Sequence, residues 1–133
     1  MSRYCLDTSA YSQFQRGDPH AVRVIDEAEW LGVPAIALGE LRAGFRVGGQ
    51  LDRNEARLRE FLANPVVEIL SVDREVSRHY ADIVFDLRRA GRPIPTNDIW
   101  IAATAARAGV PVLTDDAHLT AVDRVGSIVM SRR

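Results

Sequence analysis

Lysine is absent from this chain of 133 residues, so all 17 basic residues are arginine. The absence excludes a Walker-type nucleotide-binding loop, which needs a lysine, and it excludes a response-regulator receiver for the same reason. Arginine is the better bidentate ligand for phosphate, but codon bias alone gives the same pattern. The arginine content therefore does not by itself indicate a phosphate-binding protein.

Cysteine and long apolar runs are also scarce. The single Cys5 can form neither an intrachain disulfide nor a cysteine metal site, and its apolar surroundings predict a small core residue. No apolar run reaches the roughly 18 residues of a membrane span, and residues 1–3 lead into strand-like sequence rather than a signal peptide. We therefore expect a soluble, cytoplasmic protein without redox chemistry and without a membrane partner.

Strong positive charge is missing too, because the net charge is −1. This counts mildly against nucleic-acid binding, since a markedly basic domain is the usual electrostatic footprint of that function. The length suits one domain that buries roughly two thirds of its unfolded surface. We expect a single domain over residues 1–133, without repeats, low-complexity tracts or linkers.

Short apolar segments alternate with segments of helical periodicity along the chain. Strands are predicted at residues 3–6, 33–37, 66–72, 110–113 and 127–130. Helices are predicted at residues 8–17, 18–31, 38–48, 54–62, 73–91 and 96–109, with Thr96 or Asn97 as the cap of the last. Such alternation implies parallel pairing through right-handed crossovers. The expected fold class is therefore α/β, an open and mostly parallel sheet with helices on both faces.

Acidic residues recur at the carboxyl ends of these predicted strands. Asp7 follows the first strand, and Glu40 lies in the first helical turn after the second. Asp98 lies in the first turn of a later helix, and Asp115 and Asp116 follow the strand at 110–113. Taken singly, Asp98 is also explained as a helix-start acid and the Asp115–Asp116 pair as a polar turn. Because open parallel sheets bind ligands beyond the carboxyl ends of their strands, the recurrence predicts that the acids converge on one crevice.

A crevice lined by several carboxylates needs a positive partner, because the carboxylates repel one another. Ligation by oxygen alone fits Mg²⁺ or Mn²⁺, and the absence of an HxxH motif or a cysteine pair argues against zinc. Magnesium prefers phosphate ligands. The expected chemistry is hydrolysis of a phosphodiester bond, in which the ions activate a water for in-line attack and stabilise charge on the leaving oxygen.

Four short motifs, taken in order and spacing, resemble those of the PIN-domain ribonucleases, and most closely the VapC-type toxins of toxin–antitoxin pairs. The resemblance covers nearly the whole chain. It implies a single PIN-like domain, endoribonuclease activity that depends on Mg²⁺ or Mn²⁺, a homodimer, and a cognate VapB-like antitoxin that occupies the cleft. The motifs are Leu6-Asp7-Thr8-Ser9, Glu40-Leu41 with Gly44, Asn97-Asp98 with Ile101-Ala102-Ala103, and Leu113-Thr114 with Asp116.

The resemblance also implies roles for individual residues. Asp7 and Asp98 are the implied metal ligands, and Glu40 ligates directly or through a water. Asp116 completes the set of four acids, although Asp115 stays open as the alternative because the family pattern needs only one member of the doublet. The residues implied to orient these acids are Ser9, Asn97 and Thr114.

Other candidates carry less weight. Arg42 and Arg46 lie four residues apart and are candidates for contacts with RNA phosphates, with a solvated helix face as the alternative. His118 is a minor candidate for contact with a leaving group. Trp30 and Trp100 are candidates for stacking on bases, but packing in the core or in a subunit interface is the favoured interpretation.

Three other functions are alternatives to a ribonuclease toxin. A catalytically silent PIN-like interaction module would keep the sheet and lose part of the acidic set, yet all four acids are present. A housekeeping RNA-processing nuclease stays open. A phosphatase of the haloacid-dehalogenase type is strongly disfavoured, because it needs a lysine and a second aspartate where this chain has Ser9.

Overall fold

The computed structural model describes residues 2–130, in which five strands form one parallel sheet with the order β3-β2-β1-β4-β5. Cys5 in the central strand lies opposite Gly32 on one side and Val112 on the other. This confirms the expected α/β class. The strands are β1 (Arg3–Leu6), β2 (Trp30–Pro34), β3 (Val67–Leu70), β4 (Val112–Thr114) and β5 (Ser127–Val129).

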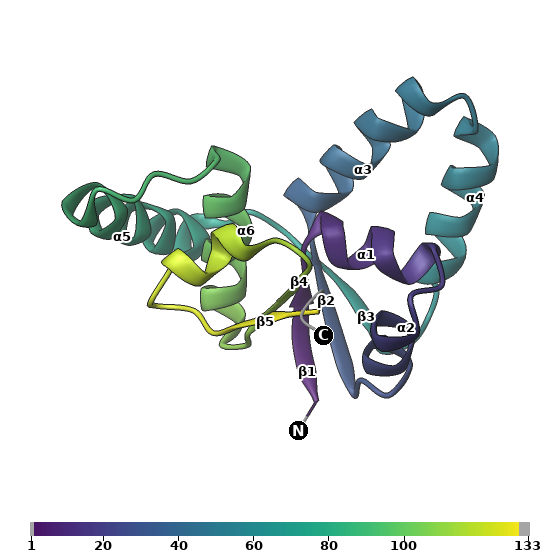
Figure 1. Cartoon of the computed structure of the whole chain (residues 1–133), viewed down its shortest axis with the longest axis horizontal. Helices are drawn as coiled ribbons and strands as arrows, with labels where there is room; N and C mark the ends of the chain where they lie inside the picture. The colour runs from purple at the N-terminus through teal and green to yellow at the C-terminus, as the bar shows by residue number, and fades with distance from the viewer. Residues whose placement is uncertain (1, 131–133) are drawn as a thin grey trace.

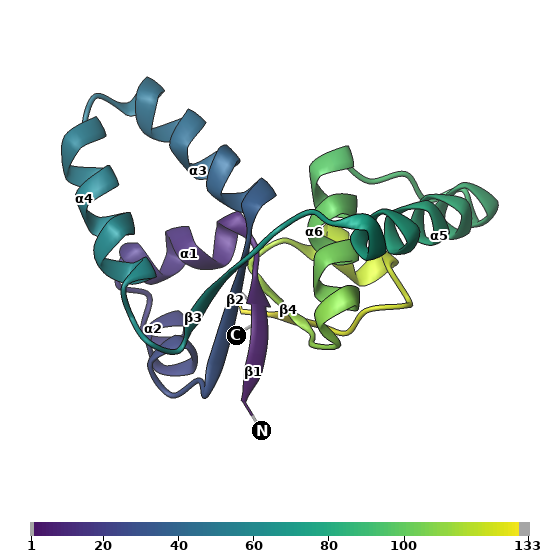
Figure 2. The ribbon, with the colours of Figure 1, turned by 180° about the vertical axis from the view of Figure 1, so that it is seen from behind.

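Helices cover both faces of the sheet, as Figures 1 and 2 show from opposite sides. One face carries α1 (Thr8–Gln15), α2 (Pro19–Asp26), α3 (Ala35–Gly48) and α4 (Leu51–Leu62), and the other carries α5 (Arg74–Ala90) and α6 (Thr96–Ala108). A 3₁₀ helix, η1 (Ala117–Ala121), follows β4. None of the described helices is long and apolar enough to cross a membrane.

The alternation of side chains along β1 divides the core into two halves. Leu6 packs with residues of α1, α2, α3 and α4, whereas Cys5, one position earlier, packs with residues of α5 and α6. Both side chains are almost fully buried. Successive residues of a strand point to opposite faces, so a single central strand anchors both helical layers. Cys5 is thus a core residue, as expected.

The boundary between the second helix and the second strand differs from the sequence prediction. The helix ends at Asp26, not at Leu31, and the strand begins at Trp30. Within this strand the Leu31 N–H donates a hydrogen bond of 2.9 Å to the carbonyl of Val66, the residue before β3. Gly32, the residue directly after the predicted helix at 18–31, lies inside β2. A Cβ at Gly32 would come within 2.5 Å of Leu70 Cδ1 and 2.6 Å of the Trp30 ring. A larger residue at position 32 would therefore displace the Leu70 and Trp30 side chains that pack over the strand.

Smaller shifts affect the elements that carry the predicted site. α3 begins at Ala35, directly after β2, so Glu40 lies in its second turn and not in its first. The residue at the cap position of α6 is Pro95, and no side chain caps this helix. Neither Thr96 nor Asn97 is the cap, and Asn97 bonds to Glu40 instead. The predicted strands at 66–72 and 110–113 are β3 (Val67–Leu70) and β4 (Val112–Thr114).

Candidate active site

Asp7 lies at the carboxyl end of β1 and is the most buried of the predicted acids, with 4% of its surface exposed. It is also the cap of α1, since its Oδ1 accepts a hydrogen bond of 2.9 Å from the Ala10 N–H. A second bond to Oδ1, of 2.8 Å, comes from the Ser9 hydroxyl, and the Thr114 hydroxyl donates to Oδ2. The carboxylate is therefore held in one orientation by three donors.

The same two hydroxyls fix the loop after β4. Ser9 Oγ accepts the N–H of Asp115 at 2.8 Å, and Thr114 Oγ1 accepts the N–H of Asp116 at 2.8 Å. Each hydroxyl thus donates to the Asp7 carboxylate and accepts a backbone N–H from the loop after β4. The result is that the acids after β1 and β4 are positioned relative to each other by a shared network.

Glu40 reaches the site from α3 and is bonded at both of its carboxylate oxygens. The Thr8 hydroxyl donates to Oε1 at 2.6 Å, and the Asn97 amide donates to Oε2 at 3.1 Å. These bonds connect α3 to the first residues of α1 and α6. Thr8 was missed as a candidate by sequence reasoning, although its place beside Asp7 in the first motif was the available signal.

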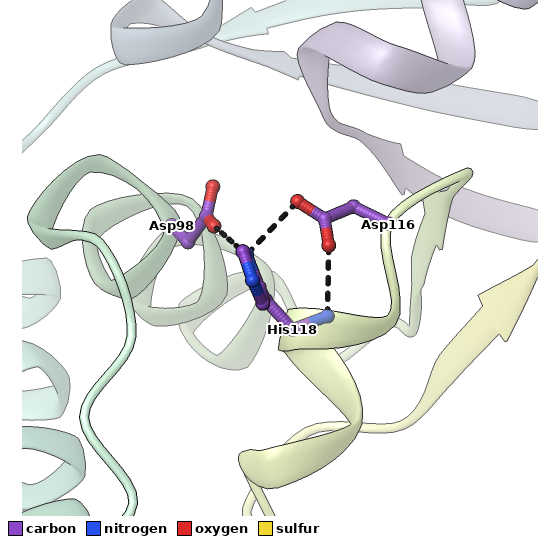
Figure 3. Close-up of side chains that lie close together, drawn as sticks. All are labelled: Asp98, Asp116 and His118. Carbon is purple, nitrogen blue, oxygen red and sulfur yellow. Dashed lines mark hydrogen bonds and ion pairs between the residues drawn. The ribbon is translucent and has the colours of Figure 1, made fainter.

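Asp98 and Asp116 face each other, with His118 between them (Figure 3). His118 Nδ1 lies 3.5 Å from Asp98 Oδ2 and 3.2 Å from Asp116 Oδ2. One ligand atom from each of the three residues falls within 4.8 Å of the others, so this group has the spacing of a metal site. Asp7 and Glu40 lie outside this closest group.

The two aspartates of the doublet have different partners. Asp115 accepts a hydrogen bond of 2.6 Å from the Gln13 amide and so is bound to α1. Asp116 instead caps η1 and lies beside His118 and Asp98. Of the two, Asp116 therefore lies with the acidic group.

Burial and mutual repulsion shift the pKa values of two of these carboxyls upward. Burial raises the pKa of Asp98, the charges of Asp116, Asp7 and Glu40 raise it further, and His118 lowers it. Burial also raises the pKa of Asp7, against the opposing effect of its three hydrogen bonds, and the charge of Asp116 adds to the rise. The charges of Asp7, Glu40 and Asp116 therefore all act on Asp98, and these four acids make up the candidate site.

The donor set suits a divalent cation. Asp98 and Asp116 offer carboxylate oxygens, which are the ligands that Mg²⁺ and Mn²⁺ prefer. A cation among these groups would also remove the repulsion that raises the pKa of Asp98. The residues present therefore fit a bound metal ion.

Comparison with known proteins identifies the family. A family model described as the PIN domain matches residues 4–125.

The chain belongs to the PIN domain family.

This PIN domain is 32% identical over 130 residues to Ribonuclease VapC5 of Mycobacterium tuberculosis, covering 96% of the chain and 93% of that relative. It is 37% identical over 102 residues to Ribonuclease VapC4 of the same organism, with 77% and 78% covered. A solved structure described as a member of the VapBC family of toxin-antitoxin systems, VapBC-5, from M. tuberculosis matches with a TM-score of 0.73. Its identity is 30%, over 96% of this chain and 98% of the other. The predicted resemblance is confirmed.

The arginines proposed for phosphate contacts are ion-paired in this PIN domain. Arg42 Nε lies 3.3 Å and Arg46 Nη1 3.8 Å from carboxylate oxygens of Glu55 on α4. Both arginine side chains are about half exposed or more. Pairs this exposed contribute little to stability, so both guanidinium groups can exchange Glu55 for another anion.

The two tryptophans pack against protein side chains. Trp100 stacks on Tyr80, with ring centroids 3.8 Å apart, where α6 meets α5. Trp30 donates its indole N–H to Glu68 at 3.2 Å and has the Arg3 guanidinium 4.6 Å from its ring centroid. This geometry favours packing over base stacking for both rings.

Proposed function

We propose that this PIN domain is a metal-dependent endoribonuclease of the VapC type, the toxin of a toxin–antitoxin pair. One observation supports the proposal: Asp98 lies close to Asp116 and His118 at the spacing of a metal site, and the charges of Asp7 and Glu40 also act on Asp98. The names of the relatives, which are ribonucleases, support RNA as the substrate. The substrate would approach from the exposed side of the site, where the His118 side chain is 56% exposed.

In the proposed site, Asp7, Asp98 and Asp116 hold the cation, and Glu40 does so directly or through a water. A bound Mg²⁺ or Mn²⁺ would activate a water for in-line attack on the phosphodiester and neutralise charge on the leaving oxygen. Ser9 and Thr114 orient Asp7 through their hydroxyls. Thr8 and Asn97 do the same for Glu40.

The proposed reaction is tested by metal removal. Purified protein should degrade RNA with Mg²⁺ or Mn²⁺ and stop when EDTA is added, because the acids cannot activate water without a cation. Cleavage would be followed by gel electrophoresis, and restoration by added metal is the control. Undiminished cleavage in EDTA would contradict the metal-dependent mechanism.

We propose a VapB-like antitoxin as the protein partner, in line with the toxin–antitoxin system to which the similar structure belongs. An uncompensated group of acids attracts cations, so this antitoxin should place an arginine or lysine between Asp98 and Asp116. Its inhibition should then weaken as Mg²⁺ is raised, because both compete for the same oxygens. An antitoxin whose binding leaves metal affinity unchanged would contradict this.

A homodimer and a cytoplasmic location are further parts of the proposal. The homodimer follows from the resemblance to VapC-type toxins. Light scattering on the purified protein measures the oligomeric state directly.

A further inference from the structure

His118 places an imidazole nitrogen inside the acidic group, which the proposed mechanism does not use. Its Nδ1 lies 3.2 Å from Asp116 Oδ2 and 3.5 Å from Asp98 Oδ2 (Figure 3). The ring is not embedded in the core, since 56% of the side chain is exposed, compared with 16% for Asp98 and 37% for Asp116. His118 Nδ1 therefore lies on the solvent-facing side of the Asp98 and Asp116 carboxylates.

Local structure holds the ring in this position. The His118 N–H donates to Asp116 Oδ1 at 2.9 Å, so the backbone of η1 and the Asp116 carboxylate are tied together. The next residue, Leu119, is 2% exposed and packs in the core half formed with α5 and α6. One carboxylate is thereby bonded to both the backbone and the side chain of the same residue. The imidazole is positioned by the fold, although it is exposed.

We infer that His118 Nδ1 is a ligand of the cation bound by Asp98 and Asp116, so that the site is a mixed oxygen and nitrogen site that selects Mn²⁺ over Mg²⁺. The inference rests on the proposed function, because it assumes that the acids hold a divalent cation. Neutral imidazole with its proton on Nε2 presents a lone pair at Nδ1, and the three ligand atoms already lie within 4.8 Å of one another.

An imidazole ligand changes which divalent cation the site prefers. Imidazole suits the transition metals, whereas Mg²⁺ prefers oxygen ligands and keeps its waters. Replacing one oxygen ligand with an imidazole therefore favours Mn²⁺. The competing explanation is that His118 only pairs with the two carboxylates and is displaced when a cation binds.

Pulsed electron paramagnetic resonance distinguishes these two roles. Mn²⁺ bound to the full chain should show nitrogen coupling from a directly bound imidazole, and the coupling should disappear in His118→Gln. The matched controls are His20→Gln and His79→Gln, on α2 and α5, which should keep it. Bound Mn²⁺ without nitrogen coupling in the wild type would overturn the inference.

Calorimetric titration gives the second readout. His118→Gln should weaken Mn²⁺ binding by about tenfold or more and Mg²⁺ binding by much less, because only Mn²⁺ gains from the nitrogen. Unchanged or tighter Mn²⁺ binding in His118→Gln would overturn the inference while leaving metal-dependent cleavage in place. A wild-type protein that binds neither ion would overturn both the inference and the proposed function.

Discussion

The two sides of the acidic site are held in different ways. On the β1 side, Asp7 is buried and receives three hydrogen bonds from two hydroxyls and a backbone N–H. On the α6 side, Asp98 and Asp116 are more exposed and have His118 as a neighbour of both. The first side is therefore fixed by hydrogen bonds within the chain. Repulsion involves both sides, because the charges of Asp116 and Asp7 act on Asp98 and the charge of Asp116 acts on Asp7. The second side has the spacing of a metal site, so a cation would change it most.

Loss of an anionic ligand should give the largest effect and should be similar on both sides. Asp7→Asn and Asp98→Asn should each reduce RNA cleavage by roughly two orders of magnitude or more, because each removes a charge that holds the cation. The measurement is the initial rate of cleavage at saturating Mg²⁺.

Asp115→Asn is the matched control for these variants, since Asp115 is bonded to Gln13 and lies outside the acidic group. Its cleavage rate should be close to that of the wild type. If Asp115→Asn abolishes cleavage and Asp116→Asn does not, the assignment within the doublet is wrong.

Thr114→Val tests whether the hydrogen bonds on the β1 side of the acidic site contribute to stability and to cleavage. It removes the hydroxyl that donates to Asp7 and accepts from Asp116, so it should destabilise the fold by about 1.5–3 kcal/mol, the usual value for a hydrogen bond to a charged group. Cleavage should fall about tenfold or more, because Asp7 loses its orientation. Denaturant unfolding measures the first effect.

Thr104→Val is the control, because Thr104 is equally buried but donates to the Trp100 carbonyl within α6. It should cost less stability and leave cleavage almost unchanged. Equal losses in both variants would show that Thr114 has only a packing role.

The sequence was sufficient for the family, the parallel sheet and the positions of the acids near the strand ends. Asp7, Asp98 and Asp116 follow strands or start helices, and such positions depend on local patterns that a sequence reveals. The extent of α2 was missed because apolar spacing at Ala28 and Leu31 fits a helix, whereas pairing with β1 and β3 places Leu31 in a strand. Long-range pairing is what a local pattern cannot reveal.

Within the site, His118 was the residue most undervalued. Its contacts depend on the 3₁₀ turn of η1, which brings the ring back toward Asp116 and across to Asp98 on another helix. The hydrogen-bond partner of Asn97 could not be predicted from the sequence either, because it comes from a distant part of the chain. Its neighbour Glu40 is 57 positions away, so only the folded chain shows that the amide bonds to Glu40 and does not cap α6.

The central claim is that the acids form one site whose charges repel until a cation binds, and Asp98 gives the most direct test. Because its pKa is raised in the fold, its contribution to stability is present below the unfolded pKa and is lost as pH rises through the folded pKa. At neutral pH the ionised Asp98 carboxylate therefore lowers the free energy of unfolding of the metal-free protein. The favourable interaction with the start of α6 is worth only about 0.3–1 kcal/mol.

The decisive measurement is the thermal unfolding of the wild type and Asp98→Asn at neutral pH, each in EDTA and in excess Mg²⁺. In EDTA the variant should melt a few degrees higher, corresponding to about 1 kcal/mol for a domain of this size. The rise in melting temperature that Mg²⁺ gives the wild type should be mostly lost in the variant. A variant that melts lower than the wild type in EDTA and keeps the full Mg²⁺ shift would contradict the claim that these acids form one metal site.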